Sequence, residues 1–315
     1  MTSPPEAEQS DGGAWSLPER IGLTAEIERL RRHLAELAER SHPEVSEMLG
    51  YQLSPRSKYF RPVTVFACSR AVGGDDVESL IPGATAAELL HNYATVTDDI
   101  VDRDELRRGQ PALHTRYGTL PAVMTGAYLT FAAFHQIADD EYLTGLFTDL
   151  GMRVAAVECR QWRLRRRPAD VDTWLTLAGE DTGAMFAACA RVATRDDRLS
   201  RFGYQLGTLY HGCDDIADLR GTLALGGHSD RDITDRIVTL PAAIAVRDPA
   251  VAELFSSDSE EHHGEFAEAL TGALPRAEEI LDELAADAER EARANAEAPD
   301  ILVDLVRYTR ELSAA

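Results

Sequence analysis

The sequence contains the stretch Asp98-Asp99-Ile100-Val101-Asp102, and the same spacing of three aspartates returns in Asp214-Asp215-Ile216-Ala217-Asp218. Each stretch closes a segment of helical periodicity. Its first and last aspartates are four residues apart, which places them on one helix face. Three carboxylates this close repel one another unless cations neutralise them. Oxygen ligands of this kind suit Mg²⁺, which keeps several waters and bridges to substrate phosphates.

An acid-rich chain can also produce this pattern by accident, since the sequence holds 27 aspartates. Three other aspartate pairs lack the third aspartate and fit helix caps or solvated loops: Asp75-Asp76, Asp139-Asp140 and Asp196-Asp197. Any single short motif carries a false-positive risk. Two complete copies, both ending helices with apolar faces, favour a pair of metal-binding clusters.

The chain around these clusters reads as helical almost throughout. Apolar positions recur at spacings of three and four, as in Leu30, His33, Leu34 and Leu37. Later helices are expected over 120–137, 141–165, 170–194, 198–218, 236–247, 264–296 and 299–313. No run of alternating β-branched residues is long enough for a sheet. We predict an all-α fold: a single-domain bundle of ten or more helices over residues 21–315, preceded by a flexible tail over residues 1–20.

Composition narrows the function classes. The 315 residues carry 32 basic and 54 acidic side chains, a formal net charge of −22, which disfavours binding to nucleic acid or to anionic membranes. The apolar fraction of 44% excludes a disordered chain. No uncharged apolar stretch is long enough to cross a bilayer, and no secretory signal is visible, so a cytoplasmic protein is expected. The four cysteines lack metal-ligand spacing and are expected to be buried thiols.

Cations stand close to the clusters in sequence. Arg107 and Arg108 follow the first cluster, where they can hold anionic oxygens or pair with the neighbouring acids. Lys58, the only lysine of the chain, stands one helical turn before Arg61. Beside two clusters suited to Mg²⁺, these cations favour a diphosphate ligand.

With these motifs the chain resembles the trans-isoprenyl diphosphate synthases of the polyprenyl synthetase family. The resemblance runs from about residue 50 to the C-terminus and is densest over 88–118 and 207–218. It implies an all-helical homodimer with a deep central cavity between two facing aspartate-rich helices. It also implies a reaction that joins an allylic diphosphate to isopentenyl diphosphate, head to tail, with Mg²⁺.

The resemblance assigns roles to individual residues. Asp98 and Asp102 match the metal ligands of the first motif, with Asp99 alongside, and Asp214, Asp215 and Asp218 match the second motif. The predicted metal ligands are Asp98, Asp102, Asp214 and Asp218, and the predicted catalytic residues are Asp98, Asp99, Asp102, Arg107, Asp214 and Asp215. Isopentenyl diphosphate binding falls to Lys58, Arg61, His91 and Arg108. Allylic diphosphate binding falls to Arg107, with Thr182 and His211 nearby.

The sequence departs from the family pattern on the allylic side. Where the family usually has a lysine in a mid-chain helix, this chain has Asp181, and a later lysine is replaced by Ile237. The usual Phe-Gln pair reads Tyr210-His211, and the Gly-Gly-Lys-Arg start of the isopentenyl side reads 56–59, Arg-Ser-Lys-Tyr. Three candidates could restore positive charge: a protonated His211, Arg236, and the arginine run 163–167, for which a solvated loop is the plainer interpretation.

Product length is expected to depend on Tyr93 and Ala94, which lie about one turn before Asp98. In the family this position limits the growing chain. A tyrosine pointing down the cavity would block elongation, which favours geranylgeranyl diphosphate first and farnesyl diphosphate second. Ordinary core packing of Tyr93 is the alternative.

Two other functions stay open at this stage. A terpene cyclase, or a prenyltransferase with another acceptor, would fit the altered allylic side but leaves Lys58, Arg61, His91 and Arg108 unexplained. A catalytically weak partner subunit would have little reason to keep both aspartate clusters.

Overall fold

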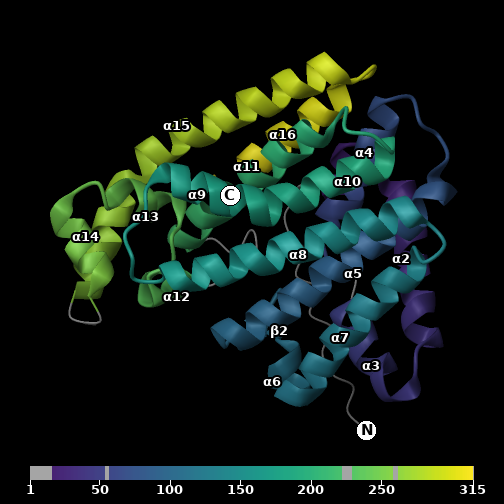
Figure 1. Cartoon of the computed structure of the whole chain (residues 1–315), viewed down its shortest axis with the longest axis horizontal. Coiled ribbons are helices and arrows are strands. Elements are labelled where there is room, and N and C mark those ends of the chain that lie inside the picture. The colour runs from purple at the N-terminus through teal and green to yellow at the C-terminus, as the bar shows by residue number, and fades with distance from the viewer. Residues whose placement is uncertain (1–15, 54–56, 222–228, 258–261, 315) are drawn as a thin grey trace, which may run out of the picture.

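The structure, a computed structural model, describes residues 16–53, 57–221, 229–257 and 262–314. Helices dominate it, as the sequence predicts (Figure 1). The helices of the first half are α1 (Leu17–Arg20), α2 (Thr24–Arg40), α3 (Pro43–Gln52), α4 (Phe60–Ala71), α5 (Val77–Asp102), α6 (Leu113–Tyr117), α7 (Thr119–Gln136) and α8 (Glu141–Leu164). The second half forms α9 (Val171–Ala178), the π-helix η1 (Gly179–Gly183), α10 (Ala184–Thr194), α11 (Ser200–Leu219), α12 (Ser229–Asp235), α13 (Leu240–Ala245), α14 (Pro249–Ser256), α15 (His263–Asn295) and α16 (Asp300–Glu311).

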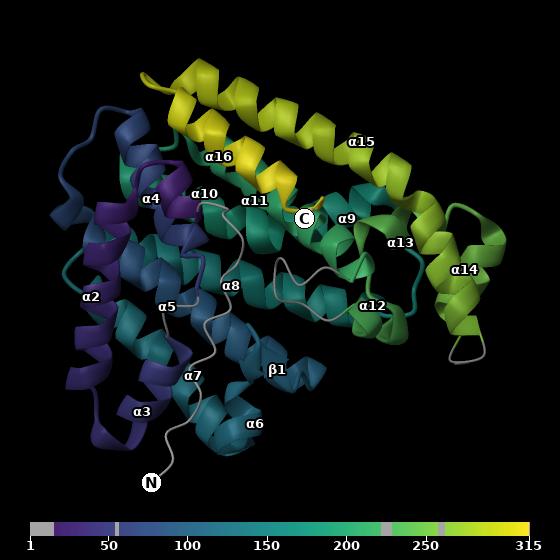
Figure 2. The ribbon, with the colours of Figure 1, turned by 180° about the vertical axis from the view of Figure 1, so that it is seen from behind.

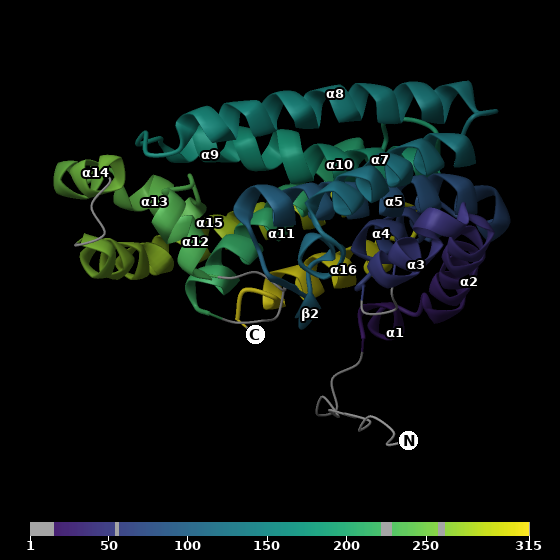
Figure 3. The same cartoon turned by 90° about the horizontal axis from the view of Figure 1, so that it is seen from below.

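The two helices that carry the aspartate clusters, α5 and α11, lie inside the bundle. Helix α5 packs against α4, α7 and α10, and α11 packs against α10, η1 and α15. Seen from below, α8 forms the outer edge on one side, and α5, α10 and α11 lie between it and α16 (Figure 3). From behind, α15 and α16 run side by side along the other face (Figure 2). Both clusters are therefore framed by helices.

Two glycines bring α11 directly onto η1 and α10. A Cβ atom at Gly203 would lie 2.5 Å from the backbone oxygen of Phe186, and one at Gly207 would lie 2.5 Å from that of Thr182. No side chain fits at these distances, so the backbones can meet only because glycine has none. This contact sets His211, one turn further along α11, beside Thr182.

Both aspartate clusters lie at helix C-termini. Helix α5 ends at Asp102 because Arg103 adopts the left-handed conformation (φ 59°), and α11 ends one residue after Asp218. The C-terminal end of a helix carries partial negative charge and disfavours carboxylates. Three aspartates at each such end are electrostatically unfavourable unless a cation binds there, which points to function rather than stability.

The structure corrects four details of the sequence interpretation. The predicted tail is wrong at its end: residues 1–15 lie outside the described residues, but Leu17–Arg20 form α1, because Ser16 and Glu19 make a capping box and Leu17 is buried. The helix predicted from residue 236 begins only at Leu240, after Arg236 adopts a φ of 53°.

The third correction concerns the thiols. Cys68, Cys189 and Cys213 are buried as expected, whereas Cys159 is exposed on α8. Two strands of two residues each, β1 (Leu106–Arg107) and β2 (Gln110–Pro111), also form a small hairpin that the sequence did not indicate. Within the described residues, no helix is both long and apolar enough to cross a membrane.

Candidate active site

The first cluster divides into residues that face the site and one that does not. Asp98 is exposed and Asp102 is half-buried, whereas Asp99 is only 1% exposed. The Asp99 carboxylate accepts a hydrogen bond from Nε of Arg107 at 2.7 Å. The pKa of Asp98 is raised well above its usual value. The main cause is the loss of hydration of the carboxylate, and repulsion by Glu158 and other nearby carboxylates adds to it. Asp99 thus positions Arg107, while Asp98 is exposed to a ligand and Asp102 is paired with Arg165.

The small hairpin places the two neighbouring arginines. Leu106 pairs with Pro111 and Arg107 with Gln110, leaving a two-residue turn in which Arg108 and Gly109 both have positive φ (53° and 74°). Two such residues are typical of a type I′ turn, whose twist matches that of the strands. Arg107 also pairs with Asp104 at 3.4 Å. Of the two roles that the sequence allows for this arginine, the structure thus shows pairing with neighbouring acids.

The four residues predicted to bind isopentenyl diphosphate gather on one side. Arg61 Nη1 lies 3.2 Å from His91 Nε2, and its guanidinium stacks 5.4 Å from the ring centroid of Phe186. Burial and the charges of Arg61 and Arg108 hold the pKa of His91 well below its usual value. The His91 ring is therefore neutral and accepts the hydrogen bond from Arg61. Burial also lowers the pKa of Lys58, with Asp214 opposing and Arg108 assisting.

A buried polar network that the sequence analysis missed supports this side. Glu88 is 1% exposed and accepts hydrogen bonds from Ser57 Oγ at 2.9 Å and from Asn92 Nδ2 at 3.2 Å. Gln52 donates to Asn92 Oδ1 at 3.2 Å. Since Ser57 precedes Lys58, the network ties the lysine to α5. A glutamate within the apolar face of a helix, three residues before His91, was the available signal.

The second cluster also has one positioning aspartate. Oδ2 of Asp215 accepts hydrogen bonds from Trp174 Nε1 and from the Leu240 backbone N–H, both at 2.8 Å. Burial raises the pKa of Asp214 to about 6. Burial and repulsion by Asp214 and Asp232 raise the pKa of Asp218 to about 8. These two carboxylates resist ionisation because burial and the neighbouring aspartates disfavour their charged forms.

The residues predicted to lie near the allylic diphosphate form a network around His211. Thr182 Oγ1 lies 2.9 Å from Asp181 Oδ2 and 3.0 Å from His211 Nδ1, and His211 Nε2 faces Asp215 Oδ1 at 3.9 Å. Although burial opposes it, the carboxylates of Asp181 and Asp215 raise the pKa of His211 to about 9. His211 is therefore an imidazolium at neutral pH, in which Nδ1–H donates to Thr182 and the threonine hydroxyl donates to Asp181.

The acidic side chains fit a hydrated divalent metal better than a preformed metal cage. Among the residues that the structure describes, no three acidic, histidine or cysteine side chains converge on one metal position. However, Oδ1 of Asp214 and Oδ1 of Asp218 are buried without a hydrogen-bond partner. Orphaned carboxylate oxygens suit a cation that takes one or two protein ligands and completes its shell with water and phosphate. Asp98, Asp102, Asp214 and Asp218 could hold Mg²⁺ in this way.

Two further charged residues at the site were missed from sequence, and a third was named only as part of the arginine run. Glu158 on α8 has a pKa raised to about 7 by burial and by Asp181, and burial with the second cluster raises the pKa of Asp232 to about 7. Arg165, at the C-terminal end of α8, pairs with Asp102 at 2.9 Å. Each lies on an element that carries no cluster, so only tertiary packing brings it to the site.

The candidates for replacing the lost lysines fare differently. Arg236 is 1% exposed, but its guanidinium stacks 4.3 Å from the ring centroid of Phe266 on α15. Its interior position is thus structural. In the arginine run, Arg163 and Arg167 are exposed as a solvated loop would have them, whereas Arg165 turns inward. The solvated-loop interpretation is wrong for Arg165.

Tyr93 lies where α5 meets α7. A Cβ atom on Gly126 would lie 3.3 Å from Cδ2 of the Tyr93 ring, so the ring covers this glycine. Tyr93 is 41% exposed and Ala94 is half-buried. The alternative of ordinary core packing does not fit a tyrosine this exposed. The blocking role of Tyr93 and the depth of a central cavity stay predictions.

Comparison with known proteins identifies the family of the chain. Residues 42–271 match the model of the polyprenyl synthetase family. The chain belongs to the polyprenyl synthetase family, whose members are prenyltransferases. It is 32% identical over 279 residues to a geranylgeranyl diphosphate synthase of Mycobacterium tuberculosis, covering 76% of this chain and 77% of the relative.

Other relatives differ in product. A nonaprenyl diphosphate synthase of the same organism is 26% identical over 287 residues, covering 84% of this chain and 86% of that protein. The crystal structure of a polyprenyl synthase from Caulobacter crescentus, complexed with calcium and isoprenyl diphosphate, superposes with a TM-score of 0.83 at 22% identity. That superposition covers 95% of this chain and 99% of the other, and it shows the shared fold.

Proposed function

We propose that this family member catalyses the Mg²⁺-dependent head-to-tail condensation of an allylic diphosphate with isopentenyl diphosphate, giving geranylgeranyl or farnesyl diphosphate. One observation carries the proposal: a cationic half-site and an acidic, metal-suited half-site adjoin each other at the facing ends of α5 and α11. Within the acidic half-site Arg107 links the two aspartate clusters, since it is paired with Asp99 and contributes to the electrostatics of Asp214 and Asp218.

The residues of the cationic half-site orient the acceptor. Lys58, Arg61 and Arg108 offer charge-assisted hydrogen bonds to its diphosphate. The neutral His91 holds Arg61 in place through the hydrogen bond at 3.2 Å. Because these three cations supply the positive charge for the acceptor diphosphate, we expect isopentenyl diphosphate to bind without a metal.

The residues of the acidic half-site handle the leaving diphosphate. When bound, Mg²⁺ would neutralise the charge that develops on the allylic diphosphate. The allylic C–O bond breaks with its electron pair passing to that diphosphate. The π electrons of isopentenyl diphosphate then form the new C–C bond, and a proton is lost to the departing diphosphate. Arg107 and the His211 imidazolium are placed to face the negative charge, and Asp99 and Asp215 hold them there.

Product length is the finer part of the proposal. Tyr93 lies about one turn before Asp98 on α5, and its ring covers Gly126 of α7. We expect the growing chain to leave the first cluster along α5 and to meet this ring. A bulky ring at this point supports a short product. Because relatives include synthases of both short and long products, length must be measured directly.

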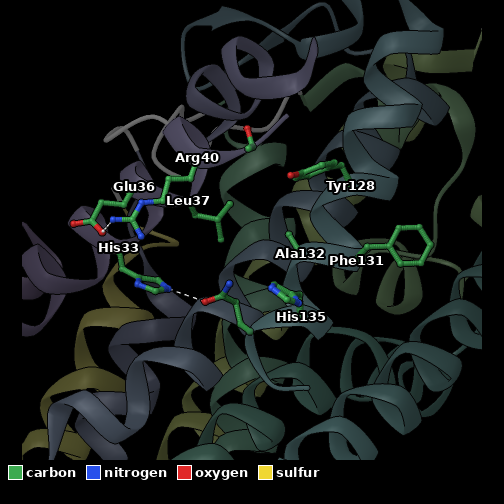
Figure 4. Close-up of a pocket in the computed structure, with 10 residues that line it drawn as sticks. His33, Glu36, Leu37, Arg40, Tyr128, Phe131, Ala132 and His135 are labelled. Carbon is green, nitrogen blue, oxygen red and sulfur yellow. Dashed lines mark hydrogen bonds and ion pairs between the residues drawn. The ribbon is translucent and has the colours of Figure 1, made fainter. Parts of the chain in front are cut away.

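We also propose a homodimer that uses the outer faces of α7 and α8. Leu120, Met124 and Phe131 are 71%, 51% and 74% exposed and follow one stripe of α7, and Met152 on α8 is 63% exposed. Large apolar side chains in such number usually mark an interface. Beside this stripe a hollow of about 550 Å³ opens between α2 and α7, with Phe131 at its edge (Figure 4). Light scattering on the parent and on a Leu120→Glu/Phe131→Glu variant tests the dimer.

The test of the function mixes the purified chain with Mg²⁺, isotope-labelled isopentenyl diphosphate, and dimethylallyl, geranyl or farnesyl diphosphate in turn. We expect a labelled prenyl diphosphate of farnesyl or geranylgeranyl length. Release of a hydrocarbon or free prenol from the allylic substrate alone, without label, would instead indicate a cyclase. Absence of turnover that is restored by a homologous subunit would indicate a partner protein. Cytoplasmic localisation stays an expectation that fractionation of the source cells would test.

A further inference from the structure

Arg165 reaches the first aspartate cluster from another part of the fold. It follows the last residue of α8, and its Nη2 pairs with Asp102 Oδ1 on α5 at 2.9 Å. Its Nη1 pairs with Asp235 Oδ2 on α12, also at 2.9 Å. The guanidinium stacks 4.1 Å from the ring centroid of Trp162, and the side chain is 19% exposed. The arginine is therefore held at the site by two carboxylates and a ring.

The backbone around Arg165 is fixed as well. The next residue, Arg166, donates its backbone N–H to the carbonyl of Arg236 at 3.1 Å. This bond fastens the loop after α8 to the loop after α12. Arg163 and Arg167, in the same arginine run, are exposed. The inward direction of Arg165 is thus built into the contact between two loops rather than shared by the whole run.

The charges around the first aspartate cluster suggest a role for Arg165. Asp98, Asp102, Glu158 and Asp181 are close enough to repel one another electrostatically. Ile237 brings no charge, and Arg236 is turned toward Phe266. Among the described residues, Arg107, His211 and Arg165 are the cations that the interactions above bring to this side. A planar guanidinium with several N–H donors can bind two phosphate oxygens at once.

We propose that Arg165 binds the diphosphate of the allylic substrate in this chain. In the free enzyme Asp102 and Asp235 occupy its donors. On substrate binding Asp102 turns to the metal and the diphosphate oxygens take its place at the guanidinium. The inference rests on the proposed function for the identity of the substrate. The predicted contact itself concerns a metal-bound diphosphate and can be tested without turnover.

The test measures calorimetric binding of inorganic pyrophosphate in the presence of Mg²⁺. The Arg165→Gln variant should bind it about 10–100-fold more weakly, the scale of losing a charge-assisted hydrogen bond. Arg165→Lys should lie in between, and the matched exposed variant Arg163→Gln should bind like the parent. Binding of isopentenyl diphosphate without metal should be the same in all four proteins.

A second variant separates binding from bracing. Asp235→Asn releases Arg165 from one carboxylate, so it should bind pyrophosphate as tightly as the parent or more tightly. If Arg165 only braces the two loops, Asp235→Asn and Arg165→Gln should both weaken the binding of pyrophosphate, and both should lower the melting temperature of the protein. That result, or unchanged affinity in Arg165→Gln, overturns the proposal. Failure of the parent to incorporate labelled isopentenyl diphosphate would overturn the proposed function alone.

Discussion

The two halves of the site solve opposite electrostatic problems. On the isopentenyl side Lys58, Arg61 and Arg108 crowd together, and a neutral His91 accepts from one of them. On the allylic side carboxylates crowd together, and His211 becomes an imidazolium between two of them. The same residue type thus takes opposite protonation states according to its neighbours. One half is ready for an anion, and the other needs a cation before an anion can enter.

The largest effect should come from removing a carboxylate that faces the site. Asp214→Ala should lower kcat by about 10²–10³-fold, as loss of one preorganised electrostatic group does. Affinity for isopentenyl diphosphate should change little, because its cations lie on the other half. Steady-state kinetics and calorimetry measure both quantities. The exposed Asp139→Ala is the matched control, and an equal loss of affinity for both substrates would refute the division into halves.

A smaller effect should follow at His211. Replacing Asp181 by asparagine removes one of the two carboxylates that hold the imidazolium, so the pKa of His211 should fall from about 9 by about 1–3 pH units. Histidine NMR resonances of the metal-free protein follow this titration. The exposed Asp172→Asn should leave it unchanged. A His211 that titrates near its ordinary value in the parent would contradict the assignment of the imidazolium.

The raised pKa values of the acidic half should make the stability of the protein, and its response to Mg²⁺, depend on pH. The pKa values of Asp214 and Asp218 are raised to about 6 and about 8, so the folded metal-free chain holds protons that the unfolded chain has lost. Its stability should therefore fall as pH rises from about 4, where the unfolded carboxyls ionise, toward 8, and His211 should extend the loss up to its folded pKa of about 9.

Binding of Mg²⁺ requires ionised carboxylates, so its stabilising effect should grow over the same range. Thermal melts at pH 6 and pH 8.5, with and without Mg²⁺, measure it. The rise in melting temperature on adding Mg²⁺ should be larger at pH 8.5 than at pH 6, by about 2–4 °C or more. That difference corresponds to about 1 kcal/mol in a domain of roughly this size. Asp218→Asn should reduce the difference. A gain that is independent of pH would argue against carboxylate ligation.

The smallest change concerns product length. Tyr93→Ala should lengthen the product by one or more five-carbon units, and Ala94→Leu should shorten it, since the two changes widen and narrow the same path. The KM for isopentenyl diphosphate should not move in either variant. Mass spectrometry of the dephosphorylated products decides. An unchanged product in both variants would remove Tyr93 from the path.

The sequence was most informative where function places charged residues at positions in a helix that disfavour them. Three aspartates at a helix C-terminus are unfavourable on their own, so the two clusters could be found by spacing alone. The helical fold followed from periodicity over long segments. Glu158 could not be found in this way, and Arg165 could not be singled out within the arginine run, because the local sequence does not show which side chains turn toward distant clusters.

Some errors had local causes that sequence patterns do not reveal. Arg236 was a plausible replacement cation, but its left-handed backbone turns it toward Phe266. The roles of Asp99 and Asp215 also differ from those of their neighbours. Each lies one residue along the helix from a ligand-facing aspartate, about 100° around the axis, and so faces protein rather than the site.

The most direct test of the two-halves description is calorimetric binding of each substrate with and without Mg²⁺. Isopentenyl diphosphate and a non-ionising allylic thiolodiphosphate serve as the two ligands. We expect isopentenyl diphosphate to bind with nearly the same affinity in both conditions and the allylic analogue to bind only when Mg²⁺ is present. Metal-independent binding of the allylic analogue, or metal-dependent binding of isopentenyl diphosphate, would contradict the assignment of the halves.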